Sequence, residues 1–233
     1  MLKKIYELIS SQPINKFIKK FMESKMSKYF INPYIDFFKV NTKEFKRHYY
    51  HSLQDFFTRE INLDMRPKSD ALYTSPCDGI IVEKGLIKQS THFFIKGKKV
   101  TLNELIGEES NEYQSFQVIY LSPKDYHRFH AIDKNHFISK KEIGNTSIPV
   151  NDLGFSCGNP FLENHRIILK TEDYAYIPIG ATNVNSIKIT KTSFDKYDEI
   201  GRFEMGSTIV ILYKKLLNNL KSGEIKVFES LIK

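Results

Sequence analysis

The chain has 233 residues, with 35 Lys or Arg and 27 Asp or Glu, so its formal charge at pH 7 is +8. Hydrophobic residues make up 41% and aromatic residues 13%, which excludes a wholly disordered chain. Two cysteines, Cys77 and Cys157, are too few for a disulfide framework or a cysteine-rich zinc site. No apolar run is long enough for a transmembrane helix, and the N-terminus lacks the features of a secretory signal.

The positive charge is concentrated at the N-terminus. Residues 1–50 contain 11 Lys or Arg and 4 Asp or Glu, whereas residues 51–233 contain 24 and 23. The main body is therefore nearly neutral and offers no broad basic face for a phosphate backbone. No nucleic-acid partner is expected for this reason.

The basic N-terminal stretch is also amphipathic. Apolar side chains recur at steps of three and four residues, which places them on one face of a helix that begins near Pro13. Such a helix either lies in a membrane interface with its lysines near lipid headgroups or packs on its own domain with its lysines in water. The apolar positions are Ile14, Phe17, Ile18, Phe21, Met22, Met26, Tyr29 and Phe30, followed by Tyr34, Ile35, Phe37 and Phe38.

Beyond residue 70 the sequence is typical of β structure, because short runs rich in Ile, Val, Phe and Tyr alternate with turn residues. The predicted fold class is α+β: a β-dominated, sandwich- or barrel-like domain at residues 61–233, preceded by amphipathic helices at residues 1–60. Strands are expected at 79–85, 91–97, 115–122, 165–170, 186–190 and 207–213, and helices at 49–60 and 101–108.

Three short motifs contain residues suited to catalysis. Asp78 lies in SPCDG, which is also a good turn sequence. His127 and His130 lie in DYHRFH and suit proton transfer; they also fit surface positions, or a metal site if further ligands joined them. Ser207 follows Gly206 in EMGST, which reads as a turn into a strand, although the glycine leaves its carbonyl open to attack. Asp78, His130 and Ser207 are the parts of a nucleophile relay, but spacing alone does not bring them together.

Segments along most of the chain resemble the phosphatidylserine decarboxylase proenzyme family. The histidine segment and the Gly-Ser-Thr near the C-terminus are the most specific of them. The matching segments are FFTREINLDMRP (56–67), SPCDG (75–79), IKGKKVTLNELIG (95–107), LSPKDYHRFH (121–130), FLENHRIIL (161–169), IPIGATNVNSIKI (177–189) and DEIGRFEMGST (198–208).

The resemblance implies a pyruvoyl enzyme that is made by self-cleavage between Gly206 and Ser207. The family's charge relay carries over to Asp78, His130 and Ser207. His130, oriented by Asp78, would take the Ser207 proton, and the serine oxygen would attack the Gly206 carbonyl. The resulting ester would break down to a covalent pyruvoyl group derived from Ser207, which is the only cofactor expected; no metal is expected.

The same resemblance implies the reaction and its location. The amine of phosphatidylserine would form a Schiff base with the pyruvoyl ketone, carbon dioxide would leave, and His127, the candidate proton donor, would complete phosphatidylethanolamine. The expected partners are the lipid, an anionic membrane surface and the two chains of one precursor, 1–206 and 207–233; a homo-oligomer is left open. The expected location is the cytoplasmic face of the inner membrane, with the enzyme bound peripherally.

Three positions depart from the family pattern. Met205 stands where Leu or Phe is common, and no effect is expected because all three are apolar. Cys77 replaces the usual Ala and is expected to be a small buried residue. His165 replaces an acid, which puts in doubt a pairing made by that acid.

Some assignments have alternatives. Arg59, Arg66 and Arg128 fit a lipid phosphate or carboxylate, or purely structural ion pairs. The activity has two alternatives: a pyruvoyl decarboxylase for a related head group or an amino acid, and a non-enzymatic basic peripheral membrane protein.

Overall fold

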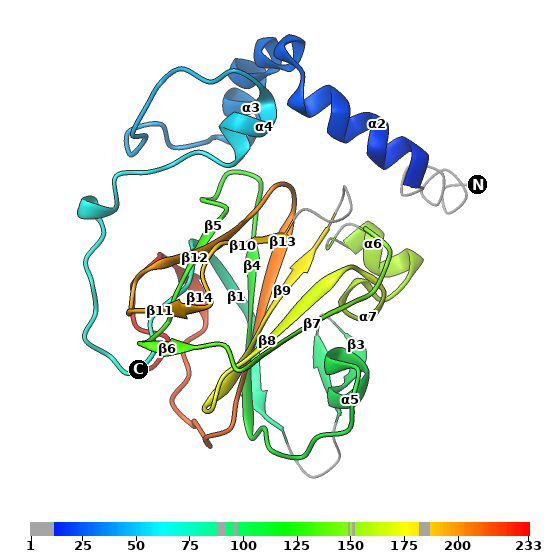
Figure 1. The fold of residues 1–233 in the computed structure, drawn as a ribbon, viewed down its shortest axis with the longest axis vertical. Helices are drawn as coiled ribbons and strands as arrows, with labels where there is room; N and C mark the ends of the chain where they lie inside the picture. The colour runs from blue at the N-terminus through cyan, green and yellow to red at the C-terminus, as the bar shows by residue number, and fades with distance from the viewer. Residues whose placement is uncertain (1–11, 88–91, 96, 149, 151, 182–186) are drawn as a thin grey trace.

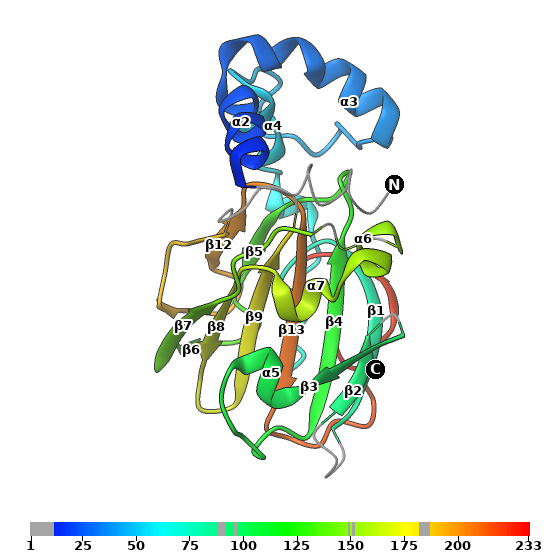
Figure 2. The same cartoon turned by 90° about the vertical axis from the view of Figure 1, so that its right-hand side faces the viewer.

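The computed structural model describes residues 12–87, 92–95, 97–148, 150, 152–181 and 187–233. A seven-stranded antiparallel sheet runs through the body of the protein (Figures 1 and 2). In spatial order its strands are β14 (Gly223–Ile225), β1 (Gly79–Leu86), β4 (Ser115–Leu121), β13 (Ser207–Tyr213), β9 (Tyr174–Gly180), β8 (Arg166–Lys170) and β7 (Ser139–Ile143).

Strand β13, which begins with Ser207, is buried on both faces of this sheet. Its side chains alternate between two cores, with Ile209 and Ile211 in one and Val210 and Leu212 in the other. Successive side chains of a strand point to opposite faces, so a strand that is covered on both sides is apolar throughout. This explains the unbroken apolar run of STIVILY.

Different elements cover the two faces of the sheet. A three-stranded sheet closes one core through Phe129, Ile200 and Phe203. Short helices and a hairpin close the other, through side chains such as Leu105 and Phe161. The three-stranded sheet consists of β10 (Ile187–Ile189), β12 (Glu199–Phe203) and β5 (Arg128–His130). The elements over the opposite face are β2 (His92–Ile95), β3 (Lys98–Thr101), α5 (Leu102–Ile106), α6 (Asp152–Cys157) and α7 (Pro160–Glu163). A further pair is formed by β6 (Asn135–His136) and β11 (Ser193–Phe194).

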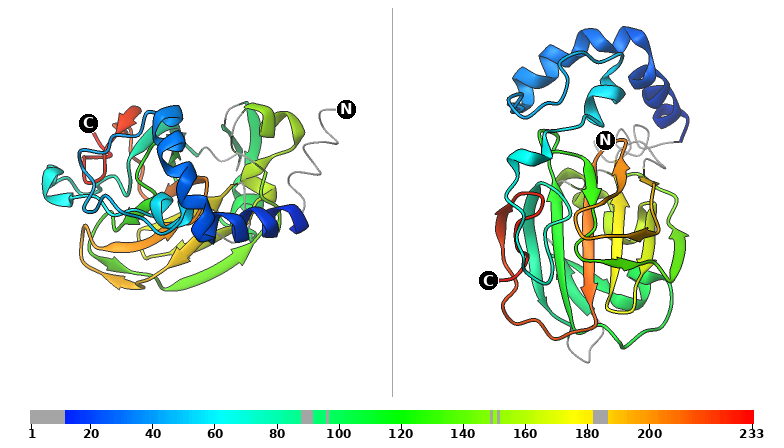
Figure 3. Two further views of the ribbon diagram at one scale, coloured as in Figure 1. Left: turned by 90° about the horizontal axis from the view of Figure 1, so that it is seen from above. Right: turned by 60° about the vertical axis from the view of Figure 1, so that its left-hand side comes forward.

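Residues 12–57, here called the helical cap, lie over one end of the main sheet (Figure 3). The cap has its own small core, in which Met22, Leu53 and Phe56 are buried. Ser27 links its helices, because the hydroxyl donates to the Met22 carbonyl and accepts from the Leu53 N–H. The cap contains α2 (Gln12–Glu23), a 3₁₀ helix (Lys25–Phe30), α3 (Ile31–Phe38) and α4 (Leu53–Phe57); a second 3₁₀ helix (Leu63–Met65) follows it.

The predicted α+β class is confirmed, with a strand-rich body and N-terminal helices. Four expected strands occur as β1, β4, β8 and β13, and β2 and β10 lie within the expected ranges 91–97 and 186–190. The helix expected at 49–60 is wrong in length, since only Leu53–Phe57 is helical. Strand β9 was not predicted. It contains Pro178, which cannot donate to a sheet ladder and usually argues against a central strand.

Candidate active site

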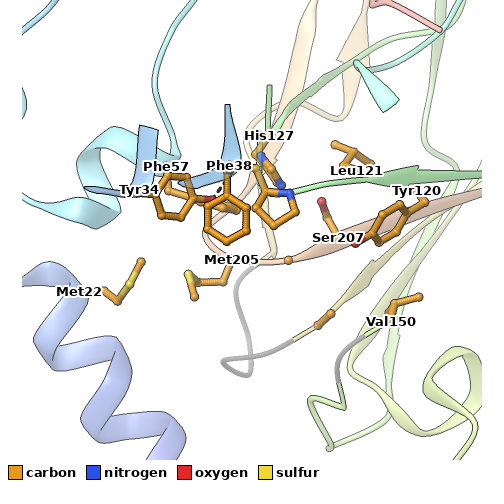
Figure 4. Close-up of a pocket in the computed structure, with 13 residues that line it drawn as sticks. Met22, Tyr34, Phe38, Phe57, Tyr120, Leu121, His127, Val150, Met205 and Ser207 are labelled. Atoms are coloured by element: carbon orange, nitrogen blue, oxygen red, sulfur yellow. Dashed lines mark hydrogen bonds between the residues drawn. The ribbon is translucent and has the colours of Figure 1, made fainter. Parts of the chain in front are cut away.

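An apolar pocket of about 240 Å³ lies between the helical cap and the end of the main sheet (Figure 4). Residues of the cap form one wall, and the start of β13 and the end of β4 form another. Among the described residues, none that lines the pocket is Lys, Arg, Asp or Glu. The lining consists of Met22, Tyr34, Phe38, Phe57, Tyr120, Leu121, Pro123, His127, Val150, Ala181, Met205, Gly206 and Ser207.

The Gly206–Ser207 bond lies at the wall of this pocket. Gly206 has a φ of +24°, and a Cβ at this position would lie 3.0 Å from the Ala181 carbonyl oxygen, so both conformation and space favour glycine. The Ala181 N–H donates a 3.0 Å hydrogen bond to the Gly206 carbonyl oxygen. A backbone donor at this oxygen would stabilise negative charge that develops there during attack on the carbonyl.

Two polar atoms in the pocket have no hydrogen-bond partner among the described residues: Oγ of Ser207 and Nε2 of His127. Both side chains are 1% exposed, and Figure 4 shows both facing the pocket. His127 Nδ1 lies 2.9 Å from the Asp125 carbonyl oxygen, which can only accept, so Nδ1 carries the proton and Nε2 a free lone pair. Buried polar atoms usually have partners, and these two lie in one pocket beside the Gly206–Ser207 bond, which makes them the candidate reactive groups of the pocket.

Several contacts fix the position of His127. The Phe57 ring packs against the imidazole with 4.0 Å between ring centroids. The Phe203 N–H donates to the His127 carbonyl oxygen, which ties the histidine segment to the strand that leads into Gly206. Arg59, which is 2% exposed, donates to the carbonyl oxygens of Lys124 and Asp125. The contacts of Arg59 therefore hold the turn that carries His127.

His130 lies in β5, outside the lining of the pocket. Its Nδ1 donates to the Tyr197 carbonyl oxygen at 2.8 Å, and its Nε2 accepts from the Tyr126 hydroxyl at 3.0 Å. The Phe228 ring meets the imidazole edge to face, 5.0 Å between centroids. Tyr197 and Phe228 both have left-handed backbones, with φ of 76° and 74°. Such strain in residues with side chains persists only where the surroundings enforce it, so the environment of His130 is tightly determined.

Asp78 is also buried and contacts the C-terminal segment of the chain. One carboxylate oxygen accepts from the Val227 N–H at 2.9 Å; the other accepts from Arg66 at 2.7 Å and lies 3.4 Å from the Lys226 ammonium. Burial raises the pKa of Asp78, and Lys226 and Arg66 oppose that rise. Asp78 and His130 thus both hold residues 226–228.

The structure therefore brings His127, Gly206 and Ser207 to one pocket. The described contacts include no hydrogen bond between Asp78 and His130, or between His130 and Ser207. The relay of Asp78, His130 and Ser207 stays a prediction.

Burial sets the charge state of both histidines. It lowers the pKa of His127 to about 3, with the nearby Arg59 adding to the shift. It lowers the pKa of His130 to about 4, although the bond to the Tyr197 carbonyl opposes the shift. A histidine with a lowered pKa is neutral throughout the physiological pH range, so both rings are in the form that can accept a proton.

The other predicted residues have structural partners. Arg66 binds both oxygens of Glu44 as well as Asp78, and Arg128 binds both oxygens of Glu199. Cys77 is fully buried, as expected. His165 lies 3.3 Å from a carboxylate oxygen of Glu142.

Sequence reasoning missed part of the site. The Ala181 N–H is a backbone group with no sequence signal. The pocket-lining role of Tyr34 and Phe38 was also missed, although their apolar cluster was noted in the sequence.

Comparison with known proteins identifies the family. The family model for phosphatidylserine decarboxylase matches residues 53–230. The phosphatidylserine decarboxylase proenzyme of Bacillus subtilis (strain 168) is 35% identical, with 92% of this chain and 88% of that protein covered. The proenzyme of Halalkalibacterium halodurans is 34% identical, with 90% and 87% covered, and that of Anoxybacillus flavithermus is 34% identical, with 96% and 90% covered. The chain belongs to the phosphatidylserine decarboxylase family.

Proposed function

We propose that this chain is the precursor of an enzyme that cleaves itself between Gly206 and Ser207 and then converts phosphatidylserine to phosphatidylethanolamine. One observation carries the proposal: the hydroxyl of Ser207 and Nε2 of His127 are unpartnered in the same apolar pocket, beside a Gly-Ser bond. The relatives named above, which carry this activity in their names, are proenzymes. A buried serine beside a glycine carbonyl is suited to attack that carbonyl.

Self-cleavage uses groups of this chain alone. Ser207 Oγ loses its proton and attacks the Gly206 carbonyl carbon, whose oxygen is held by the Ala181 N–H. The C–N bond breaks, and the Gly206 carbonyl becomes an ester on Ser207 with a free amine at residue 207. Loss of the α-proton then expels the Gly206 carboxylate. The dehydroalanine that remains at residue 207 is hydrolysed by water. Its nitrogen leaves as ammonia, and a pyruvoyl group remains at the start of β13.

The proton of Ser207 has two possible acceptors, and we assign it to His130, as the family resemblance implies. His130 is neutral, so it can accept, but Tyr126 must first release Nε2. Asp78 supports this arrangement through its bonds to Val227 and Lys226, the two residues before Phe228, whose ring packs on His130. His127, whose Nε2 is already free, is the competing acceptor.

The pocket fits a pyruvoyl group at residue 207, because the Ser207 oxygen has no other partner there. When present, that group supplies a carbonyl for the substrate amine and takes up the electrons released with carbon dioxide. The apolar lining excludes water from the carboxylate of the substrate. The carboxylate loses its charge when carbon dioxide leaves, so the removal of water destabilises the charged substrate and favours the reaction. His127 takes a proton at Nε2, helped by the anionic substrate, and delivers it to the product.

The helical cap supports a membrane partner. Phe17, Met26, Tyr29 and Phe37 are 71–78% exposed, although large apolar side chains are normally covered. Exposed lysines lie on α2 and on the 3₁₀ helix, the elements that carry Phe17, Met26 and Tyr29. No helix in the described part of the chain is long and apolar enough to cross a membrane. We propose that the cap rests on the anionic surface of the inner membrane, on its cytoplasmic side.

Carbon dioxide release from vesicles tests this function. The processed protein should decarboxylate phosphatidylserine in vesicles and leave free serine unchanged. Phe17→Ser with Phe37→Ser should lower vesicle binding at least ~10-fold, because each phenyl ring contributes on the order of 1.5 kcal/mol when it enters the interface. Vesicle sedimentation measures the binding, and high salt should weaken it further by screening the lysines.

Leu216→Ser is the matched control. Leu216 is 55% exposed and follows β13, whose other end carries Ser207, so it lies away from the cap. This variant should bind vesicles like the wild type. Equal loss of binding in both variants would argue against the cap as the membrane surface.

A further inference from the structure

Glu204, two residues before Gly206, contacts both the helical cap and the body of the protein. Its side chain is 9% exposed and has one cation from each half: Lys188 of β10 contacts one carboxylate oxygen, and Lys19 of α2 lies 3.4 Å from the other. Gln54 of α4 donates a 2.6 Å hydrogen bond to the Glu204 backbone carbonyl. The residue two positions before Gly206 is therefore bound by two helices of the cap.

The neighbouring residue continues this connection. Met205 packs against the core of the helical cap, which includes Met22, and both line the pocket that holds Ser207. On the opposite side, the N–H of Phe203 is bonded to the His127 carbonyl oxygen in the body. Residues 203–205 thus lie between the cap and the body. Figure 2 shows the cap helices over the end of the main sheet where β13 begins.

Helix α2 carries Phe17, one of the exposed residues proposed to meet the membrane, as well as this contact. Phe17 is 73% exposed, while Lys19, two residues along the helix, reaches Glu204. A movement of α2 at a bilayer would therefore act on Glu204 through the Lys19 contact. The cap also supplies Tyr34 and Phe38 to the pocket wall, so a shift of the cap would change the entry to Ser207.

We propose that Lys19 and Gln54 are positioning residues that clamp the helical cap to Glu204 and so hold the pocket open toward the bilayer for an incoming lipid. This inference rests on the proposed function. It concerns delivery of a membrane lipid rather than the chemistry at Ser207. The bond from the Tyr34 hydroxyl to the Pro123 carbonyl remains without the clamp, so the cap is expected to stay folded on the body.

The test compares two substrates: phosphatidylserine in anionic vesicles and a water-soluble short-chain phosphatidylserine. In the processed enzyme, the double variant Lys19→Met, Gln54→Ala should lower turnover of the vesicle lipid about 10-fold. The variant removes one ion pair and one hydrogen bond, and the loss of both together corresponds to roughly a tenfold change in rate. Turnover of the short-chain lipid should stay within about twofold, because its entry does not depend on the bilayer. Lys188→Met, which removes the other cation from the same carboxylate, should leave both rates within about twofold.

Three results would overturn the inference. The double variant could keep the wild-type rate on vesicles, or it could lose activity equally on both substrates, which would indicate local damage at Ser207. Lys188→Met could also reproduce the selective loss on vesicles. A wild-type protein that releases no carbon dioxide from either lipid would instead overturn the proposed function, and the inference with it.

Discussion

Replacing Ser207 with Ala should leave a single chain of 233 residues with no decarboxylase activity. The hydroxyl is the nucleophile of the proposed cleavage and the source of the pyruvoyl carbonyl, so its loss removes both at once. We expect cleavage to fall by at least ~1000-fold, as for other nucleophiles that act in a concerted group. A denaturing gel of the purified protein measures cleavage, and carbon dioxide release measures activity.

Thr208→Val is the matched control for this substitution. Thr208 is the next residue of β13, and its hydroxyl is also buried without a partner among the described residues. Its side chain points to the other face of the sheet, because directions alternate along a strand. This variant should still cleave. If Ser207→Ala also yields two chains, the cleavage assignment is wrong.

Substitutions of the two histidines of DYHRFH should affect different steps: His130 self-cleavage and His127 decarboxylation. His130→Gln should slow self-cleavage by ~100-fold or more, the usual contribution of a general base. His127→Gln should still cleave, but should decarboxylate ~100-fold or more slowly, because Nε2 of His127 faces the pocket that the substrate enters. Intact mass measures cleavage, and turnover by the processed chains measures decarboxylation.

The pH dependence of cleavage tests whether a buried, neutral histidine takes the Ser207 proton; it gives the same result for His130 and His127, since burial lowers the pKa of both. Burial lowers the pKa of His130 to about 4, so the neutral form is lost only as the pH falls toward that value. The cleavage rate should therefore change less than about twofold between pH 8 and 5.5, whereas a histidine of ordinary pKa would lose about 10-fold. His136→Gln, which removes an exposed histidine, is the control. Normal cleavage in His130→Gln and none in His127→Gln would show that His127 takes the Ser207 proton.

Local patterns predicted the parts of the fold that local sequence determines. The apolar runs at β4 and β13 predicted strands, and each is an inner strand that is buried on both faces. The family resemblance placed the proposed cleavage site at Gly206–Ser207, and the structure favours glycine there through a positive φ and the nearby Ala181.

The rest of the site depends on contacts between distant residues. The Ala181 N–H reaches Gly206 only because β9 pairs with β13, and Pro178 hides β9 in the sequence. The apolar face of residues 14–30 was expected to be continuous, but Met22 turns inward to the pocket while Phe17 and Met26 stay exposed. A helical pattern shows that residues share a face; it does not show which of them are covered.

The intact mass of the purified wild-type protein tests the central claim most directly. The proposed function predicts two chains, residues 1–206 and residues 207–233, with the smaller lighter than the plain peptide by one ammonia and blocked at its N-terminus. Such a mass would report cleavage and pyruvoyl formation together. An active protein that consists of one intact chain, or whose small chain begins with an unmodified serine, would contradict the account.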